Sequence, residues 1–438
     1  MTNFAVLFEM RCSKTHSMLL LLALLLCGIV AKGQDYPWLS HNNIMVEVRA
    51  HAGVFWHHHF EMQKFNAHYP AIEASIYQNT FGKNEWEAVY NYPYIGVTFY
   101  HANFGINFEN NPEVGKALGS VYALYPFINY PLNPNENSQL TFKLGVGLGY
   151  LTKHFDNFEN YQDFSIGSHF NAAVNLSFEY RQRITQRLMS VASFGLTHFS
   201  NGSTKLPNYG LNTFSAAWGL AYYLRQPRIN LTPTRRPEYR PFEFDHKHWF
   251  SVDFDYGIGF KNVSQTLGGD TTHFYQVHEL STCLLAQFTQ YSRAGASLSV
   301  ALDLSDQTLP DHFRDEKGLH LRKYNIVTNQ EEIHDITTLQ MTKINLGLCY
   351  VMTMERLSYH FEVGWHLRYN NYTDFSKGNM YQKVKFRYQV HDNIYTHLSL
   401  MTHFGRADYL CFGLGYRFNQ KYYINNEKGT RHHPPGLH

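Results

Sequence analysis

A histidine and a serine stand two residues apart near the middle of the chain, as His198 and Ser200 in the run GLTHFSNG over residues 195–202. Successive residues of a β-strand point to opposite faces, so residues two apart share a face. A neighbouring imidazole can take the proton of a serine hydroxyl and make it a nucleophile. The pair therefore predicts an esterase-like site at the end of a strand.

The sizes of the surrounding side chains predict the face on which this pair lies. From residue 188 to 200 the bulkier residues occupy the even positions. The next segment sorts more sharply, because its even positions hold Phe214, Trp218, Leu220 and Tyr222 while small or polar residues hold the odd ones. This alternation is typical of a membrane β-barrel wall, with lipid outside and a narrow packed lumen inside. By the same parity, His198, Ser200 and Asn212 face the lipid.

Composition and the first residues indicate an exported membrane protein. After residue 33 no segment offers the roughly 18 consecutive apolar residues of a membrane helix, although the chain has 32 tyrosines and 33 phenylalanines. Basic residues, a short apolar run over 18–30 and small residues at 31 and 33 predict a signal peptide at 1–33. A net charge of +2 gives no reason to propose nucleic acid as a partner. We expect a β-barrel of the bacterial outer membrane.

The rest of the chain divides into two similar halves. Residues 34–225 hold eight expected strands, at 44–56, 67–78, 86–101, 116–127, 139–152, 165–181, 187–199 and 213–225. A connection rich in proline and arginine follows at 226–246, then a second, degenerate half at 247–419 and a polar tail at 420–438. Residues 252–259 echo 46–53, 361–364 echo 142–145, and Thr402-His403-Phe404-Gly405 echoes Thr197-His198-Phe199-Ser200. The copy has glycine in place of the serine, so we place catalysis in the first half.

Two all-β architectures satisfy this pattern, and both are transmembrane antiparallel β-barrels. One is a single barrel of roughly 14 to 16 strands, and the other is a pair of tandem eight-stranded barrels. The single barrel is favoured, because the connection is short and each half would otherwise need its own closing pair of strands.

Strand direction predicts where the candidate site lies in the membrane. With a periplasmic amino terminus the seventh strand runs outward, so His198 and Ser200 are level with the outer leaflet. A substrate can reach a lipid-facing site by lateral diffusion, which indicates a lipid. In Gram-negative bacteria that leaflet is chiefly lipopolysaccharide.

The same segment resembles the signature of the lipid A 3-O-deacylase (PagL-like) family of outer-membrane esterases. The resemblance rests on His198 and Ser200 together with Asn201, Pro207, Asn208 and Gly210, and it covers roughly residues 40–225. The second half resembles the long extension of some Bacteroidetes relatives. The resemblance implies hydrolysis of an ester-linked 3-hydroxyacyl chain of lipid A, so the partner is lipid A within lipopolysaccharide.

The family also implies roles for individual residues. Ser200 would be the nucleophile and His198 the general base. Backbone donors around Asn201 and Gly202, with Asn208 holding the loop or donating directly, would stabilise the oxyanion. One residue departs from the pattern, because Asn212 stands where the family has a glutamate that orients the histidine. Asparagine can still accept a hydrogen bond from the imidazole, and Asp163 is a possible substitute, whereas Glu179 is placed near the periplasmic end.

The sequence predicts neither a metal site nor a cofactor. Cleavage of the signal peptide leaves Cys283, Cys349 and Cys411, which are far apart in sequence and lack Cys-x-x-Cys spacing. The large second half and the asparagine at 212 keep an alternative function open, a non-catalytic barrel that is porin-like or structural.

Overall fold

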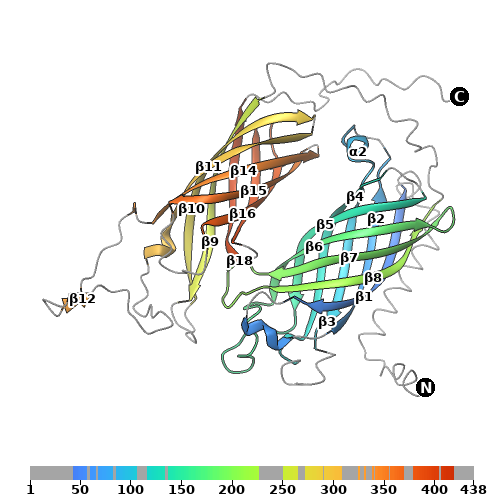
Figure 1. The fold of residues 1–438 in the computed structure, drawn as a ribbon, viewed down its shortest axis with the longest axis horizontal. Helices are drawn as coiled ribbons and strands as arrows, with labels where there is room; N and C mark the ends of the chain where they lie inside the picture. The colour runs from blue at the N-terminus through green and yellow to red at the C-terminus, as the bar shows by residue number, and fades with distance from the viewer. Residues whose placement is uncertain are drawn as a thin grey trace.

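The computed structural model contains two separate β-barrels (Figure 1). It describes residues 43–56, 60–65, 68–81, 85–105, 116–133, 137–225, 250–264, 272–289, 291–307, 324–325, 330–331, 338–339, 341–354, 356–368, 378–403 and 406–418. The expected signal peptide, the 226–246 connection and the 420–438 tail lie outside these ranges. No helix among the described residues is long and apolar enough to span a bilayer.

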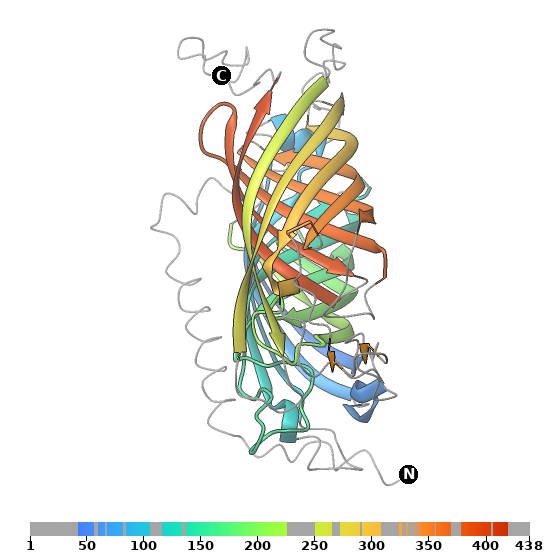
Figure 2. The same ribbon diagram turned by 90° about the vertical axis from the view of Figure 1, so that its left-hand side faces the viewer.

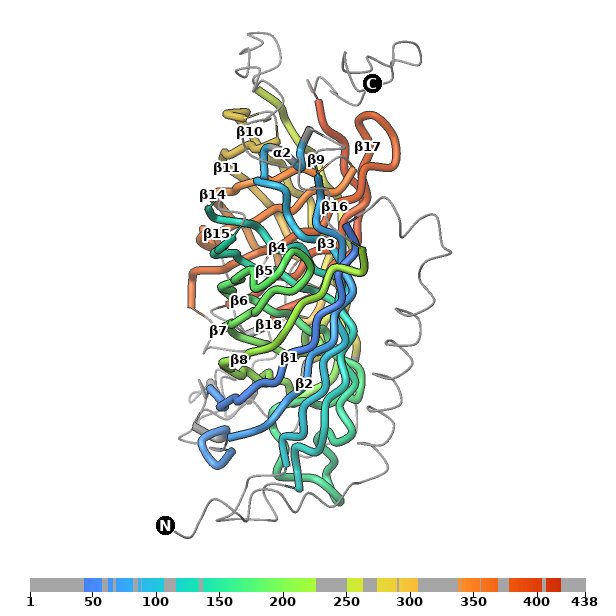
Figure 3. The backbone as a smooth tube through the Cα atoms, turned by 90° about the vertical axis from the view of Figure 1, so that its right-hand side faces the viewer, coloured from blue at the N-terminus to red at the C-terminus, as the bar shows by residue number. Residues whose placement is uncertain are grey.

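The first barrel consists of eight antiparallel strands that lie side by side in chain order (Figure 3). Its strands are β1 (Ile44–Phe55), β2 (His68–Asn79), β3 (Tyr94–Asn103), β4 (Ser120–Pro131), β5 (Ser138–Leu151), β6 (Phe170–Arg183), β7 (Leu188–Ser200) and β8 (Leu211–Tyr223). Pairing of β1 with β8, from Met45 opposite Tyr223 to Phe55 opposite Thr213, closes the cylinder.

The second barrel closes in the same way, by pairing of β18 with β9 (Figure 2). Its strands are β9 (Phe250–Ser264), β10 (Thr272–Thr289), β11 (Ser292–Asp303), β14 (Thr342–Met354), β15 (Leu357–Arg368), β16 (Met380–Gln389), β17 (Ile394–His403) and β18 (Arg406–Phe418). A small separate sheet pairs β12 (Tyr324–Asn325) with β13 (Gln330–Glu331). The preference for one large barrel is therefore wrong, and the tandem alternative is confirmed, because each half supplies its own closing pair.

All eight expected strands of the first half are present, but the third, fourth and sixth begin later than expected, at 94, 120 and 170 instead of 86, 116 and 165. The largest error is at the start of the third. Residues 86–93 do not extend β3; the short helix α2 (Glu85–Val89) occupies part of this segment. Asn91 and Tyr92 adopt positive φ angles of 58° and 57°, which a strand does not accommodate. The chain therefore turns before Pro93 and enters the strand at Tyr94.

The sequence echoes fall on equivalent strands of the two barrels. Residues 46–53 and 252–259 lie in β1 and β9, each the first strand of its barrel. Residues 142–145 and 361–364 lie in β5 and β15, each the fifth. The shared positions support a duplicated eight-stranded unit.

The outer and inner faces of the wall differ as expected from the alternation. Phe194 and Trp218 are 59% and 61% exposed on the outside, whereas Thr197 and Thr213 are buried in the lumen.

The lumen also holds charged side chains that the alternation of large and small residues did not reveal. Arg49 pairs with Glu47, Glu73 and Glu179, and Arg181 and Lys143 join the same network.

These charged side chains fill the middle of the first barrel. Arg49, Glu73, Glu179, Arg181 and Lys143 are each no more than 2% exposed. Three cations face three carboxylates once Glu47 is included, so the network is neutral. A porin-like conduit needs a water-filled lumen, and this packing disfavours one.

Candidate active site

The hairpin of β7 and β8 positions the candidate catalytic residues. His198 lies directly opposite Asn212 in the antiparallel register. Both have the parity of the exposed Phe194 and Trp218, so they lie on the outer face, as the sequence predicts. Ser200 follows on the same face at the end of β7, with its Cα about 6.8 Å from that of His198 by strand geometry.

The His198 ring is held from two sides. Its Nδ1 lies 2.6 Å from Oδ1 of Asn212. A carbonyl oxygen only accepts hydrogen bonds, so Nδ1 carries the proton and Nε2 keeps its lone pair. Gly210 covers the ring, because a Cβ built there would lie 2.7 Å from Cε1 of His198. The arrangement gives the tautomer that a general base needs.

The Ser200 hydroxyl accepts two hydrogen bonds. The Asn208 side-chain amide donates at 2.9 Å, and the backbone N–H of Gly202 donates at 3.2 Å. Within the described part of the chain, Ser200 Oγ has no direct hydrogen bond to His198. The two donors converge on the atom where an attacking oxygen would stand.

Asn201 ties the loop that follows β7 into one unit. Its backbone N–H donates to the Asn208 side chain at 3.2 Å, and its own amide donates to the Lys205 carbonyl at 2.7 Å and to Ser168 Oγ at 3.1 Å. Gly202 and Ser203 adopt φ angles of 66° and 64°. This turn aims the Gly202 N–H back at Ser200.

Asp163 does not orient His198; through Ser165 it supports the loop between β7 and β8 that ends at Gly210. One of its carboxylate oxygens accepts hydrogen bonds from the backbone N–H and the hydroxyl of Ser165, and the Ser165 carbonyl accepts from Gly210 N–H at 2.9 Å. Burial raises the pKa of the Asp163 carboxyl to about 7, although the Ser165 hydrogen bonds oppose this shift. The acceptor on His198 is Asn212, and Glu179 lies in the lumen, inside the wall.

The second barrel contacts the same loop, which the sequence did not indicate. Ser203 Oγ donates to the Ala407 carbonyl at 2.7 Å, and Asn262 N–H donates to the Ser203 carbonyl at 2.9 Å. A Cβ on Gly202 would lie 3.6 Å from Leu410. Ser200 is only 4% exposed, so the open lipid exposure expected for it is wrong; the loop covers its hydroxyl and the second barrel borders the loop.

The second barrel does not reproduce the site. His403 of β17 is the sequence counterpart of His198, but it is buried in the lumen, where its Nε2 lies 2.9 Å from Nε2 of His366. His403 continues the inward parity of His397, Ser399 and Met401 along β17. Gly405, the counterpart of Ser200, lies outside the described residues.

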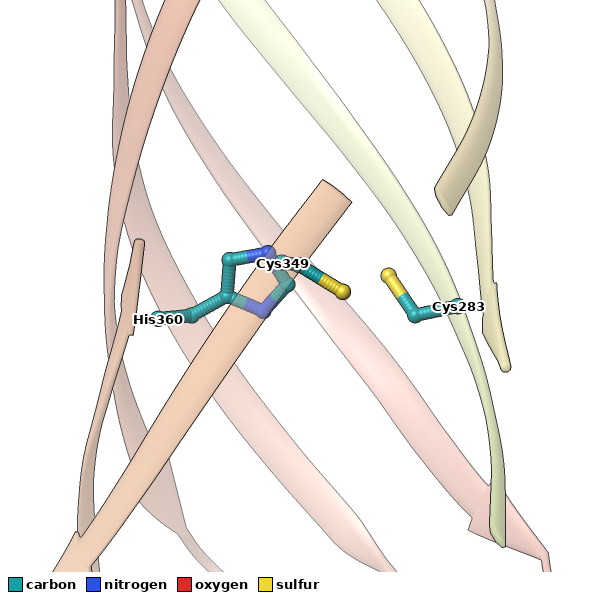
Figure 4. Close-up of side chains that lie close together, drawn as sticks. All are labelled: Cys283, Cys349 and His360. Carbon is teal, nitrogen blue, oxygen red and sulfur yellow. The ribbon is translucent and has the colours of Figure 1, made fainter. Parts of the chain in front are cut away.

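Two of the three cysteines also depart from expectation. Cys283 and Cys349 are far apart in sequence but close in space, because β10 and β14 flank β11 and both side chains enter the lumen. They meet His360 of β15 there (Figure 4). Inward parity was readable from the sequence, but the order of the strands around the second barrel was not.

Two family models match, one on each barrel. Residues 71–221 match "Lipid A 3-O-deacylase (PagL)", and residues 250–420 match "Acyloxyacyl hydrolase, C-terminal domain". The boundary between the matches coincides with the boundary between the barrels. No curated protein matches the chain.

Several solved outer-membrane structures are similar. The outer membrane enzyme PagL has 14% identity and a TM-score of 0.28, over 40% of this chain and 97% of that one. Neisserial surface protein A has 10% identity and a TM-score of 0.27, over 41% and 97%. Omp33 of Acinetobacter baumannii has 5% identity and a TM-score of 0.16, over 86% and 98%. With both barrels matched by models of the same family, this chain belongs to the PagL family of bacterial outer-membrane lipid A deacylases.

Proposed function

We propose that this protein is a serine esterase that removes an ester-linked 3-hydroxyacyl chain from lipid A in the outer membrane. The observation that carries the proposal is one hairpin end on which His198, its acceptor Asn212 and Ser200 share the outer face. Two hydrogen-bond donors already converge on the Ser200 hydroxyl. This is the minimum set for acyl transfer, namely nucleophile, base, orienting group and oxyanion donors.

The reaction proceeds in two halves. Ser200 Oγ attacks the ester carbonyl carbon while Nε2 of His198 takes the hydroxyl proton. The tetrahedral oxyanion receives hydrogen bonds from Asn208 and the backbone around Asn201 and Gly202, and then the sugar alkoxide leaves with the proton held by His198. Water, activated by the same nitrogen, hydrolyses the acyl-enzyme and releases the 3-hydroxy fatty acid.

Binding of the substrate has to rearrange the loop slightly. In the present arrangement Asn208 donates to Ser200 itself. When the ester carbonyl arrives, Asn208 transfers this hydrogen bond to the carbonyl oxygen and frees Ser200 to turn toward His198. Catalytic hydrogen bonds are often long or misaligned before substrate binds.

The test is the mass spectrum of lipid A from cells that express the full chain. We expect loss of one hydroxyacyl chain with the intact sequence and no loss with Ser200→Ala. Ser190→Ala is the matched control, because Ser190 lies on the outer face of the same strand but at its other end. Unchanged lipid A with a folded wild-type barrel would refute the deacylase assignment, and full activity of Ser200→Ala would refute the serine mechanism.

The same spectra identify the ester that is cut. Loss of a 3-hydroxy fatty acid indicates cleavage of the primary ester on the sugar. Loss of an unsubstituted fatty acid indicates cleavage of a secondary acyloxyacyl ester, and would replace the substrate proposed here.

A filled lumen also predicts no single-channel conductance from the first barrel.

A further inference from the structure

The lumen of the second barrel holds a cluster of soft ligands that the deacylase mechanism does not use. The sulfurs of Cys283 and Cys349 and one ring nitrogen of His360 all lie within 4.8 Å of one another. Cys283 and His360 are fully buried and Cys349 is 5% exposed. Figure 4 shows the two sulfurs and the imidazole turned toward one another.

Glu362 fixes the His360 ring in the manner of a metal ligand. Nε2 of His360 lies 3.1 Å from a Glu362 carboxylate oxygen and donates its proton there. Nδ1 then carries a lone pair, and this buried atom has no hydrogen-bond partner among the described residues. A carboxylate on one imidazole nitrogen, with the other nitrogen free to bind, is the usual support of a metal-ligating histidine.

The fold keeps the two thiols from forming a disulfide. Cys283 lies opposite Ser297 of β11, and Cys349 lies opposite Gly295 on the other side of that strand. Two strand spacings alone come to about 9 Å, and the offset of two residues along β11 adds to the separation of their Cα atoms. A disulfide requires less than about 7 Å, so the sulfurs face each other as thiols even in an oxidising compartment.

We propose that Cys283, Cys349 and His360 bind a thiophilic divalent ion of the zinc class inside the second barrel. Binding releases the two thiol protons and leaves a neutral unit of one dication and two thiolates. Tetrahedral zinc places two thiolate sulfurs about 3.8 Å apart, which small side-chain movements within the 4.8 Å cluster reach. The apolar Leu285 and Val351 pack beside the cysteines. A water molecule would take the fourth position that three protein ligands leave.

The surrounding charges suit two thiolates. Lys385 and Arg387 both interact electrostatically with Cys283. Lys385 pairs with Asp255, and Arg387 pairs with Asp253 as well as with Asp255, so each cation keeps a carboxylate partner when the dication binds. Because all three ligands are buried, we expect the ion to enter while the barrel folds.

The experiment refolds the full chain into detergent micelles with Co²⁺ alone, which reports thiolate ligation through its visible and near-ultraviolet absorption. We expect one equivalent of tetrahedral, sulfur-ligated cobalt that Zn²⁺ displaces. Cys283→Ser, Cys349→Ser and His360→Gln each weaken binding at least about tenfold, and Glu362→Gln weakens it about tenfold through the ring orientation. Cys411→Ser is the matched control, because this buried cysteine belongs to a different cluster of the same lumen.

Folding of every variant is checked by the mobility difference between heated and unheated samples on a gel. Absence of sulfur-to-cobalt bands in the folded wild type would overturn the proposal. An equal loss of binding in Cys411→Ser would do the same, as would a Cys283–Cys349 disulfide in protein taken from the outer membrane.

Discussion

At the scale of single residues, the candidate site depends on how the His198 ring is held. Asn212 accepts from Nδ1 at 2.6 Å, and Gly210 packs against Cε1. Each contact is made by one residue of the same hairpin or its loop, so each can be removed without altering the barrel wall.

Replacing Asn212 tests the orienting contact. We expect Asn212→Ala to lower kcat by about 10²-fold, because the imidazole loses the acceptor that sets its tautomer. Asn212→Glu should raise kcat above the wild type, since a carboxylate stabilises the imidazolium better than an amide does. Release of hydroxy fatty acid from lipid A in detergent measures both, and equal rates for the wild type and Asn212→Ala would show that the contact is not used.

Replacing Gly210 tests the packing on the ring. Gly210→Ala places a methyl group 2.7 Å from the imidazole, at a φ of 78° that costs a residue with a side chain about 1 to 2 kcal/mol. We expect kcat to fall sharply while the barrel remains folded. Gly378→Ala is the control, because a Cβ there meets nothing within 4 Å. Unchanged kcat in Gly210→Ala would mean that the ring moves freely.

At the scale of elements, two loops of the first barrel support each other above the hairpin. The loop before β6 carries Asp163, Ser165 and Ser168, and the loop after β7 carries Asn201, Gly202 and Asn208, the proposed oxyanion donors. Gly167 permits their close approach, because a Cβ there would lie 2.8 Å from the Lys205 carbonyl. The protonation state of Asp163 therefore affects the site indirectly.

The raised pKa of Asp163 predicts a pH-dependent stability of these loops. The carboxyl ionises near its ordinary value of 3.8 when the loop opens but only near 7 when the loop is closed. The stabilisation is complete below the lower value and declines until pH passes the upper one. Amide exchange of Gly210, corrected for its intrinsic pH dependence, should show this decline, and Asp163→Asn should remove it. If the corrected exchange rate of Gly210 changed equally with pH in the wild type and in Asp163→Asn, Asp163 would not be the group responsible.

At the scale of the whole molecule, the two barrels meet at two separate places. One is the loop after β7, where Ser203 contacts Ala407 and Asn262 of the second barrel. The other lies around α2, where Trp86, Ile128 and Met354 form a buried cluster and Tyr90 Oη donates to the carbonyls of Tyr291 and Thr353. The second barrel is thus placed to steady the loop that carries the candidate site residues.

Two single substitutions separate these contacts. Ser203→Ala removes the hydrogen bond to Ala407, worth about 1 kcal/mol, and we expect kcat to fall by up to about fivefold with faster amide exchange at Gly202. Tyr90→Phe removes the hydrogen bonds at the other contact and should leave kcat unchanged. If the two variants lowered kcat equally, the loop would depend on the association of the two barrels as a whole and not on the Ser203 contact.

The sequence by itself determined the strand pattern, the duplication, the outer face of the hairpin and the histidine, serine and asparagine on it. These follow from a period of two, which is local and survives any arrangement of the strands. Tertiary structure decided what depends on pairing between distant segments. It closed each half at eight strands, turned His403 inward and brought Cys283 to Cys349. It also covered Ser200 with its own loop and set the second barrel against that loop, because strand pairing and barrel contacts join residues whose separation in the chain carries no periodic signal.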